Sequence, residues 1–132
     1  MQSQFTDNAQ EALRAASRCA SSLKQGYVGT EHILVGLLKE QTGVAQKILT
    51  ENSVELSKVM DMIRESIAFE GGVGIHERSG YSPRAQKVLE EAHRQTARFG
   101  QKKTGTEHLL LALIKEGDNV AVRLLGTLGA NI

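Results

Sequence analysis

Apolar residues recur along the chain at intervals of three and four positions, the spacing that places side chains on one face of an α-helix. Three such stripes stand out. In chain order they are Ala9, Leu13, Ala16, Ala20 and Leu23; then Leu56, Val59, Met60, Ile63 and Ile67; and last Ala85, Leu89, Ala92, Thr96 and Phe99. Each stripe is several helical turns long, so the pattern predicts amphipathic helices packed around a shared core.

The chain contains two copies of one helical unit. Shifted by 76 positions, residues 5–49 align with residues 81–125 without a gap, and 17 of these 45 positions are identical. Self-similarity on this scale marks a duplicated supersecondary unit, and two copies favour a pseudo-twofold globule over an open solenoid. We divide the single domain, residues 1–132, into repeat one (5–68), a glycine-rich linker (69–80) and repeat two (81–132).

Signals for the start of a helix occur at matching places in both repeats. Thr6 and Ser82 are predicted to cap the first helices, and Pro83 suits the first helical position after Ser82. Thr30 and Thr106 are predicted to cap strongly apolar second helices in the same way.

Short third helices are predicted at 44–49 and 120–125, and repeat one has a fourth helix along the stripe that begins at Leu56. The counterpart of Leu56 in repeat two is Ile132, the last residue of the sequence. We therefore predict an all-α fold of two pseudo-twofold-related four-helix repeats, with the last helix of repeat two missing or truncated.

Composition and charge exclude several classes of function. The net charge is +1, which leaves no basic stripe for nucleic acid. No apolar stretch approaches 18 residues, so we expect no membrane span or signal peptide and a cytoplasmic location. The sequence has neither a GxxxxGK[ST] phosphate loop nor a GxSxG nucleophile motif. The domain is therefore expected not to be an enzyme.

The tetrapeptide Gly-Thr-Glu-His occurs twice, at 29–32 and at 105–108, although most neighbouring positions differ between the repeats. Good capping accounts for a threonine followed by an acidic residue, and is worth about 1 kcal/mol per helix. Capping does not require the same four residues in both copies. Glu31 and Glu107 are therefore candidate binding residues, since a carboxylate on a fixed turn can hold a guanidinium or an ammonium group.

Other reactive side chains favour structural roles. His32 and His108 lack the HxxxH, HExxH or cysteine partners of a metal site, so no metal is expected. Cys19 is the single cysteine of the chain. It lies beside the first apolar stripe and is expected to be a partly buried, unreactive thiol.

Both repeats carry an aromatic residue followed by a hydroxyl residue (Phe5–Thr6 and Tyr81–Ser82), then "GTEHILVGLLKE" or "GTEHLLLALIKE", then a Val-Ala…Leu signature. This arrangement resembles the double Clp-N motif, the N-terminal domain of Clp-family AAA+ unfoldases, and is most similar to the ClpC branch. The resemblance implies a domain without a cofactor, monomeric in isolation, that docks adaptor proteins and tagged substrates. The parent protein would feed the ClpP peptidase.

The resemblance to the ClpC branch also implies recognition of phosphoarginine, a degradation mark on proteins. The implied binding residues are Glu31, Glu107, Thr30, Thr106, Phe5, Thr6, Tyr81 and Ser82. Arg84, Lys87 and Lys103 are candidate phosphate partners in repeat two, where repeat one has Asn8 and Glu11 in place of Arg84 and Lys87. On this basis the Glu107 site is expected to bind phosphoarginine more tightly than the Glu31 site.

Two alternatives to an unfoldase domain remain open. The first is a freestanding Clp-N protein that acts as an adaptor or regulator, which would show the same features. The second is an enzyme, a hydrolase with Glu31 and Glu107 as paired carboxylates. It is disfavoured because equivalent positions of two repeats suit two similar binding sites better than an acid and a base.

Overall fold

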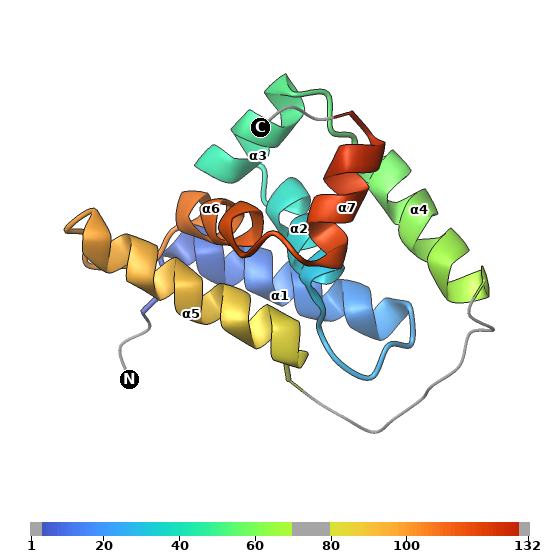
Figure 1. The fold of residues 1–132 in the computed structure, drawn as a ribbon, viewed down its shortest axis with the longest axis horizontal. Helices are drawn as coiled ribbons and strands as arrows, with labels where there is room; N and C mark the ends of the chain where they lie inside the picture. Colours follow the sequence, from blue (N-terminus) through green and yellow to red (C-terminus); the bar gives the residue numbers. More distant parts are fainter. Residues whose placement is uncertain (1–3, 70–79, 130–132) are drawn as a thin grey trace.

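The computed structural model describes residues 4–69 and 80–129, which form seven helices and no strand (Figure 1). The helices are α1 (Asp7–Ser22), α2 (Thr30–Lys39), α3 (Val44–Glu51), α4 (Leu56–Phe69), α5 (Pro83–Arg98), α6 (Thr106–Glu116) and α7 (Val120–Thr127). The all-α prediction is confirmed, with four helices in repeat one and three in the described part of repeat two. Residues 70–79 of the predicted linker lie outside the described residues, as do residues 130–132.

The first helix of each repeat begins as predicted. The Thr6 hydroxyl accepts the N–H of Ala9 at 3.1 Å, and the Ser82 hydroxyl accepts the N–H of Ala85 at 3.1 Å. Pro83 follows as the first residue of α5. These caps satisfy backbone donors that have no partner inside the helix.

The second helices begin differently from the prediction. The N-caps of α2 and α6 are Gly29 and Gly105, whereas Thr30 and Thr106 are the first helical residues. The N-cap assignment of the two threonines is therefore wrong. Each threonine hydroxyl has a partner elsewhere in the fold, as described below.

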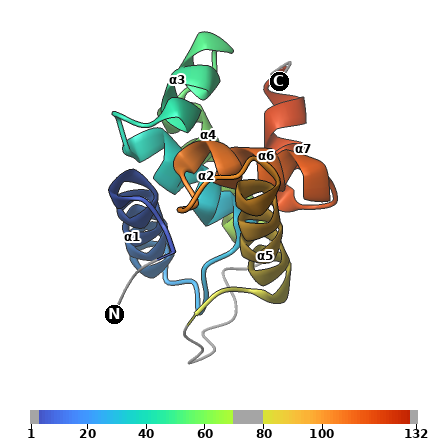
Figure 2. The same ribbon diagram turned by 90° about the vertical axis from the view of Figure 1, so that its left-hand side faces the viewer.

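The core lies where α2 and α6 meet, and Figure 2 shows α1 and α5 on opposite flanks with α2 and α6 between them. Ile33 and Leu37 on α2, like Leu109 and Leu113 on α6, are fully buried. Gly36 lets α2 approach α1 closely, because a Cβ at this position would collide with the backbone carbonyl of Ala12. Small residues at a crossing of this kind allow short distances between helix axes.

Among the described side chains, the predicted stripes match the buried faces with one exception; the side chain of Ile67 lies outside them. Val59 and Ile63 of α4 are buried, as is Cys19, whose Sγ lies 3.9 Å from the Sδ of Met60. Burial raises the pKa of the Cys19 thiol, which fits the predicted unreactive role. Phe99 was expected on the apolar face of α5, but it is the C-cap residue and 64% exposed.

Two short backbone pairings join the repeats crosswise. Phe5 pairs with Thr104 and Val28 pairs with Tyr81, each as an isolated parallel bridge. The N–H of Thr6 donates to the Thr104 carbonyl at 2.9 Å, and that of Ser82 donates to the Val28 carbonyl at 2.8 Å. The segment that leads into the second helix of one repeat therefore runs beside the start of the first helix of the other.

The third helix of each repeat also packs against the other repeat. α3 of repeat one packs against α6 of repeat two, and α7 of repeat two packs against α2 of repeat one (Figure 1). Each Gly-Thr-Glu-His turn is thus in contact with elements of the other repeat.

Candidate functional site

The histidine of each repeated turn holds the turn together. The N–H of Gly29 donates to Nδ1 of His32 at 2.8 Å, and the N–H of Gly105 donates to Nδ1 of His108 at 2.8 Å. The imidazole thus takes the role that glutamate or glutamine plays in a capping box. Burial lowers the pKa of His32, although the neighbouring Glu31 opposes this shift. A neutral imidazole is the form that can accept the Gly29 hydrogen bond.

The threonine of each turn caps a helix of the other repeat. Thr106 Oγ1 accepts the N–H of Ala45, in the first turn of α3, at 3.3 Å. Thr30 Oγ1 accepts the N–H of Ala121, in the first turn of α7, at 3.4 Å. These threonines therefore tie the repeats together, which explains why both are buried and both are retained.

The glycine of each turn makes room for the glutamate. A Cβ on Gly29 would lie 2.5 Å from Oε1 of Glu31, and one on Gly105 would lie 2.6 Å from Oε1 of Glu107. Each carboxylate therefore folds back over the N-terminal end of its own helix. Both glutamates remain partly exposed, so their carboxylates are available to a ligand.

Glu31 lines a pocket of about 360 Å³, which we call the Glu31 pocket. Its walls come from three helix starts: residues 29–31 at α2, residues 82–84 at α5, and residues 118–120 with Arg123 at α7. A helix N-terminus carries unpaired N–H groups and a partial positive charge. The pocket therefore combines two carboxylates, those of Glu31 and Asp118, with three positive helix ends.

Arg84 is the charged residue of this pocket with the best-defined partners. Its Nη1 lies 2.8 Å from Oε2 of Glu116 and 3.7 Å from Oδ2 of Asp118. The hydrogen bond to Glu116 raises the pKa of Arg84. A guanidinium has five N–H donors, so this pairing leaves others for a ligand.

The structure changes which residues belong together. Arg84 and Ser82 were grouped with Glu107, their neighbour within repeat two, but both line the pocket of Glu31. The grouping of Arg84 with Glu107 is wrong, because the backbone pairings cross between the repeats. Lys87 is exposed on α5 and lies outside the residues that line the Glu31 pocket.

Asn119 and Arg123 also line the Glu31 pocket, and sequence reasoning did not include them. Asn119 caps α7 by accepting the N–H of Val122 at 2.9 Å. At the equivalent position repeat one has Gly43, which caps α3 without a side-chain hydrogen bond. Asn119 could have been identified from the sequence, because it immediately precedes a short apolar helix and asparagine is a favoured N-cap residue.

Of the remaining predicted residues, Phe5 and Tyr81 lie at the crossed backbone pairings. The Phe5 ring packs against His93, with centroids 4.9 Å apart and the ring planes tilted by 45°. Tyr81 is half-buried, and burial raises its pKa. Neither residue lines the Glu31 pocket.

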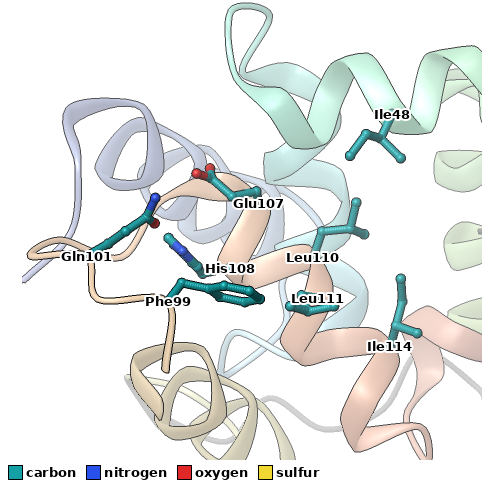
Figure 3. A pocket seen from close by; sticks show the side chains of 8 residues that line it. All are labelled: Ile48, Phe99, Gln101, Glu107, His108, Leu110, Leu111 and Ile114. Carbon is teal, nitrogen blue, oxygen red and sulfur yellow. The ribbon is translucent and has the colours of Figure 1, made fainter. Parts of the chain in front are cut away.

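Glu107 stands at the rim of a different, apolar pocket of about 480 Å³ (Figure 3). Figure 3 shows its carboxylate beside Gln101 and His108, with aliphatic side chains from α6 and Ile48 of α3 further along. Phe99 and Leu111 are its exposed apolar residues. At the position equivalent to Leu111, Val35 of α2 is fully buried, and α4 packs against that helix.

Within residues 4–69 and 80–129, no helix is long and apolar enough to cross a bilayer. In the same residues, no three His, Cys, Asp or Glu side chains gather closely enough to hold a metal ion.

The fold thus consists of two helical repeats with crossed backbone pairings, and each repeat presents a partly exposed glutamate at the start of its second helix. Residues 4–128 match the family described as the Clp repeat (R) N-terminal domain, and the chain belongs to this family. The resemblance drawn from the repeated motif is thereby confirmed.

Curated relatives come from two branches of these chaperones. The chain is 40% identical over 134 residues to the chaperone protein ClpB of Oceanobacillus iheyensis, and 38% identical over 128 residues to the negative regulator of genetic competence ClpC/MecB of Bacillus subtilis. Each alignment covers 97% of this chain, which spans 16% of the length of either relative.

Solved structures share the fold. The N-terminal domain of the chaperone ClpD from Arabidopsis thaliana has a TM-score of 0.74 at 24% identity, covering 97% of this chain and 89% of that one. A complex of the ClpV N-domain with a VipB peptide has a TM-score of 0.71 at 19% identity, covering 97% of this chain and 79% of that one.

Proposed function

We propose that this domain recognises phosphoarginine side chains on protein substrates, and that the Glu31 pocket is a site of recognition. The observation that supports this most directly is the pairing of a carboxylate with Arg84, Arg123 and three helix N-termini in one pocket. Phosphoarginine carries a guanidinium and an anionic phosphoryl group on the same side chain. It therefore requires opposite charges at a short separation.

The chemistry of the pocket meets both requirements. The Glu31 carboxylate can accept hydrogen bonds from the guanidinium N–H groups, as in other arginine–carboxylate pairs. The phosphoryl oxygens can accept from free N–H groups at the starts of α5 and α7 and from the Arg84 guanidinium. An unmodified arginine would use only the first set of contacts, and inorganic phosphate only the second.

A titration followed by NMR tests the proposal. Free phosphoarginine, arginine and inorganic phosphate are added separately to the ¹⁵N-labelled domain, and the amide signals of Gly29 and Gly105 are followed. We expect phosphoarginine to shift Gly29 at concentrations where arginine and inorganic phosphate leave Gly29 unchanged. Equal shifts of Gly29 from arginine alone, or none from phosphoarginine, would remove the phosphoarginine assignment and leave adaptor docking.

The apolar pocket beside Glu107 favours a second role, the docking of adaptor proteins. Its exposed Phe99 and Leu111 offer apolar surface that an adaptor helix or loop would cover. One structural neighbour is described as an N-domain with a bound peptide, which supports peptide docking on this fold.

The larger protein that we propose is a ClpC-like ATP-dependent unfoldase that acts in the cytoplasm and feeds ClpP. Relatives named as ATP-binding subunits of the Clp protease support this reading. The alternative is a freestanding Clp-N adaptor or regulator. A phosphate-binding GxxxxGK[ST] motif in the coding sequence beyond residue 132 would decide for the unfoldase.

A further inference from the structure

The two repeated turns have different surroundings, because each is completed by the other repeat. The Glu31 turn faces the starts of α5 and α7, and the Glu107 turn faces the starts of α1 and α3. Positions that are equivalent in the repeat alignment therefore serve opposite sites. Arg84 at the Glu31 site corresponds to Asn8 at the Glu107 site.

The second difference concerns a carboxylate at the end of each second helix, which is half-buried in Glu116 and buried in Glu40. At the Glu31 site this residue is Glu116, and both of its oxygens have partners: Nη1 of Arg84 at 2.8 Å from Oε2, and Nδ2 of Asn119 at 2.7 Å from Oε1. Burial acts against ionisation of Glu116, but these hydrogen bonds from Asn119 and Arg84 prevail and hold its pKa below the ordinary value.

At the Glu107 site the corresponding residue is Glu40, and neither partner of Glu116 has the same residue at its equivalent position. Oε2 of Glu40 accepts the Thr42 hydroxyl at 2.6 Å, but Oε1 is buried and accepts no hydrogen bond from the described residues. The position of Asn119 is taken by Gly43, and that of Arg84 by Asn8. The Glu40 residue as a whole is only 8% exposed, so its unpartnered oxygen lacks compensation from solvent.

Glu40 points toward the repeated turn of repeat two. A Cβ on Gly43 would lie 2.6 Å from Oε1 of Glu40 and 2.7 Å from Oγ1 of Thr106. The unpartnered oxygen is therefore next to the first residue of α6, which immediately precedes Glu107. Two carboxylates approach one helix start, and the side chain that would neutralise one of them is missing.

The charge inventory of the two sites follows from these substitutions. The Glu31 site has Arg84 and Arg123 against Glu31, Asp118 and Glu116. At the equivalent positions, the Glu107 site has Lys47 against Asp7, Glu40 and Glu107. The Glu107 site has one cation fewer for the same number of carboxylates, so it would repel an added phosphoryl dianion more strongly than the Glu31 site, whereas a simple cation would relieve the repulsion.

We infer that the two sites take different classes of ligand. The Glu31 site binds the phosphorylated guanidinium, and the Glu107 site binds an unphosphorylated cationic side chain, arginine or lysine. The first half of this assignment rests on the proposed function and specifies which site performs it. The Glu107 carboxylate also borders the apolar pocket, so its ligand is a basic residue within an apolar peptide segment.

Titration of the domain with each class of ligand tests the inference. Amide spectra of the ¹⁵N-labelled domain are recorded with phosphoarginine and, separately, with Nα-acetylarginine amide. We expect phosphoarginine to shift Gly29 and acetylarginine amide to shift Gly105. Glu31→Gln should abolish the first response alone, and Glu107→Gln the second alone.

Two further variants follow from the charge difference. Arg84→Asn should weaken phosphoarginine binding at Gly29 by about tenfold or more, the cost of losing one charged hydrogen-bond donor. Asn8→Arg places a guanidinium opposite Glu40 and should create a second phosphoarginine response at Gly105. Position 8 is exposed, so this variant keeps the fold, and unchanged thermal unfolding serves as the control.

The possible failures are distinct. Equal phosphoarginine affinities at Gly29 and Gly105 in the unaltered domain would overturn the assignment of different ligands but leave the proposed function intact. The absence of any phosphoarginine response would overturn both. Failure of acetylarginine amide to shift Gly105 would remove the second half of the inference.

Discussion

The hydroxyl of Thr30 accepts a hydrogen bond from the N–H of Ala121, 91 positions further along the chain, at 3.4 Å. The hydroxyl of Thr106, in repeat two, likewise accepts the N–H of Ala45, in repeat one, at 3.3 Å. The helix that each threonine stabilises thus belongs to the other repeat. The repeated motif is a reciprocal connection as well as a candidate binding site.

Replacement of either threonine by valine tests this connection. Thr30→Val and Thr106→Val keep the shape of the side chain but leave a buried N–H at the start of α7 or α3 without its acceptor. We expect each variant to lose about 1–3 kcal/mol of unfolding free energy, measured by urea denaturation. Thr50→Val is the control, since Thr50 is exposed, and should change stability by less than about 0.5 kcal/mol. If neither variant loses more unfolding free energy than Thr50→Val, the two hydrogen bonds do not contribute to stability.

A second prediction concerns the packing of α1 on α2. Gly36→Ala places a methyl group against the backbone carbonyl of Ala12, which cannot move without separating the two helices. We expect a loss of about 1–3 kcal/mol in unfolding free energy. Gly126→Ala is the matched control, because a Cβ there meets no atom within 4 Å. It should stabilise α7 by about 0.5–1 kcal/mol, since alanine favours the helix over glycine. Stabilisation by both changes would contradict the close approach of α1 and α2.

The sequence was sufficient to predict what depends on local chemistry. The caps at Thr6 and Ser82, and the order of the helices, follow from neighbouring residues and were predicted correctly. The role of Thr30 was assigned wrongly because its partner, Ala121, is distant in the chain. Arg84 was grouped with Glu107 for the same reason, since repeat alignment shows which positions are equivalent but not which are in contact. The exposure of Phe99 depends on which distant parts of the chain pack over α6, and the spacing of apolar residues along one helix does not predict this.

Stability should fall in mild acid because of two histidines. Burial lowers the pKa of His93, and burial lowers that of His32 despite the opposing effect of Glu31. Between the lowered folded value and the ordinary value of 6.5, the unfolded chain binds more protons, so unfolding free energy rises with pH. This contribution is complete above about pH 6.5 and is lost as the pH falls through the folded pKa values.

Urea denaturation at pH 7.5 and pH 5.5 measures this effect, in a range where carboxylates remain mostly ionised. We expect lower stability at pH 5.5, and a smaller difference between the two pH values in His93→Gln. A domain that is equally stable at both pH values, or more stable in acid, would contradict the assignment of neutral imidazoles with lowered pKa values.

The exposed apolar residues of the Glu107 pocket should bind apolar probes. Phe99→Ser removes a side chain that is 64% exposed, so it should reduce the fluorescence of bound bis-ANS without a comparable loss of stability. Val44→Ser is the matched control, since Val44 is 49% exposed but does not line this pocket. Equal reductions in both variants would mean that the dye does not report on the pocket.

The glycine of each repeated turn offers a test that separates binding from folding. The φ of Gly29 is −96°, a value that alanine adopts without strain, so Gly29→Ala should fold normally. Its new methyl group would lie 2.5 Å from Oε1 of Glu31 and must displace the carboxylate. Because the carboxylate is the proposed partner of the guanidinium, we expect phosphoarginine affinity to fall about tenfold, while unfolding free energy changes by less than about 1 kcal/mol. Gly105→Ala makes the same change at Glu107 and should leave phosphoarginine affinity unaltered, as measured by calorimetric titration. A larger loss for Gly105→Ala than for Gly29→Ala would reverse the assignment of the two sites.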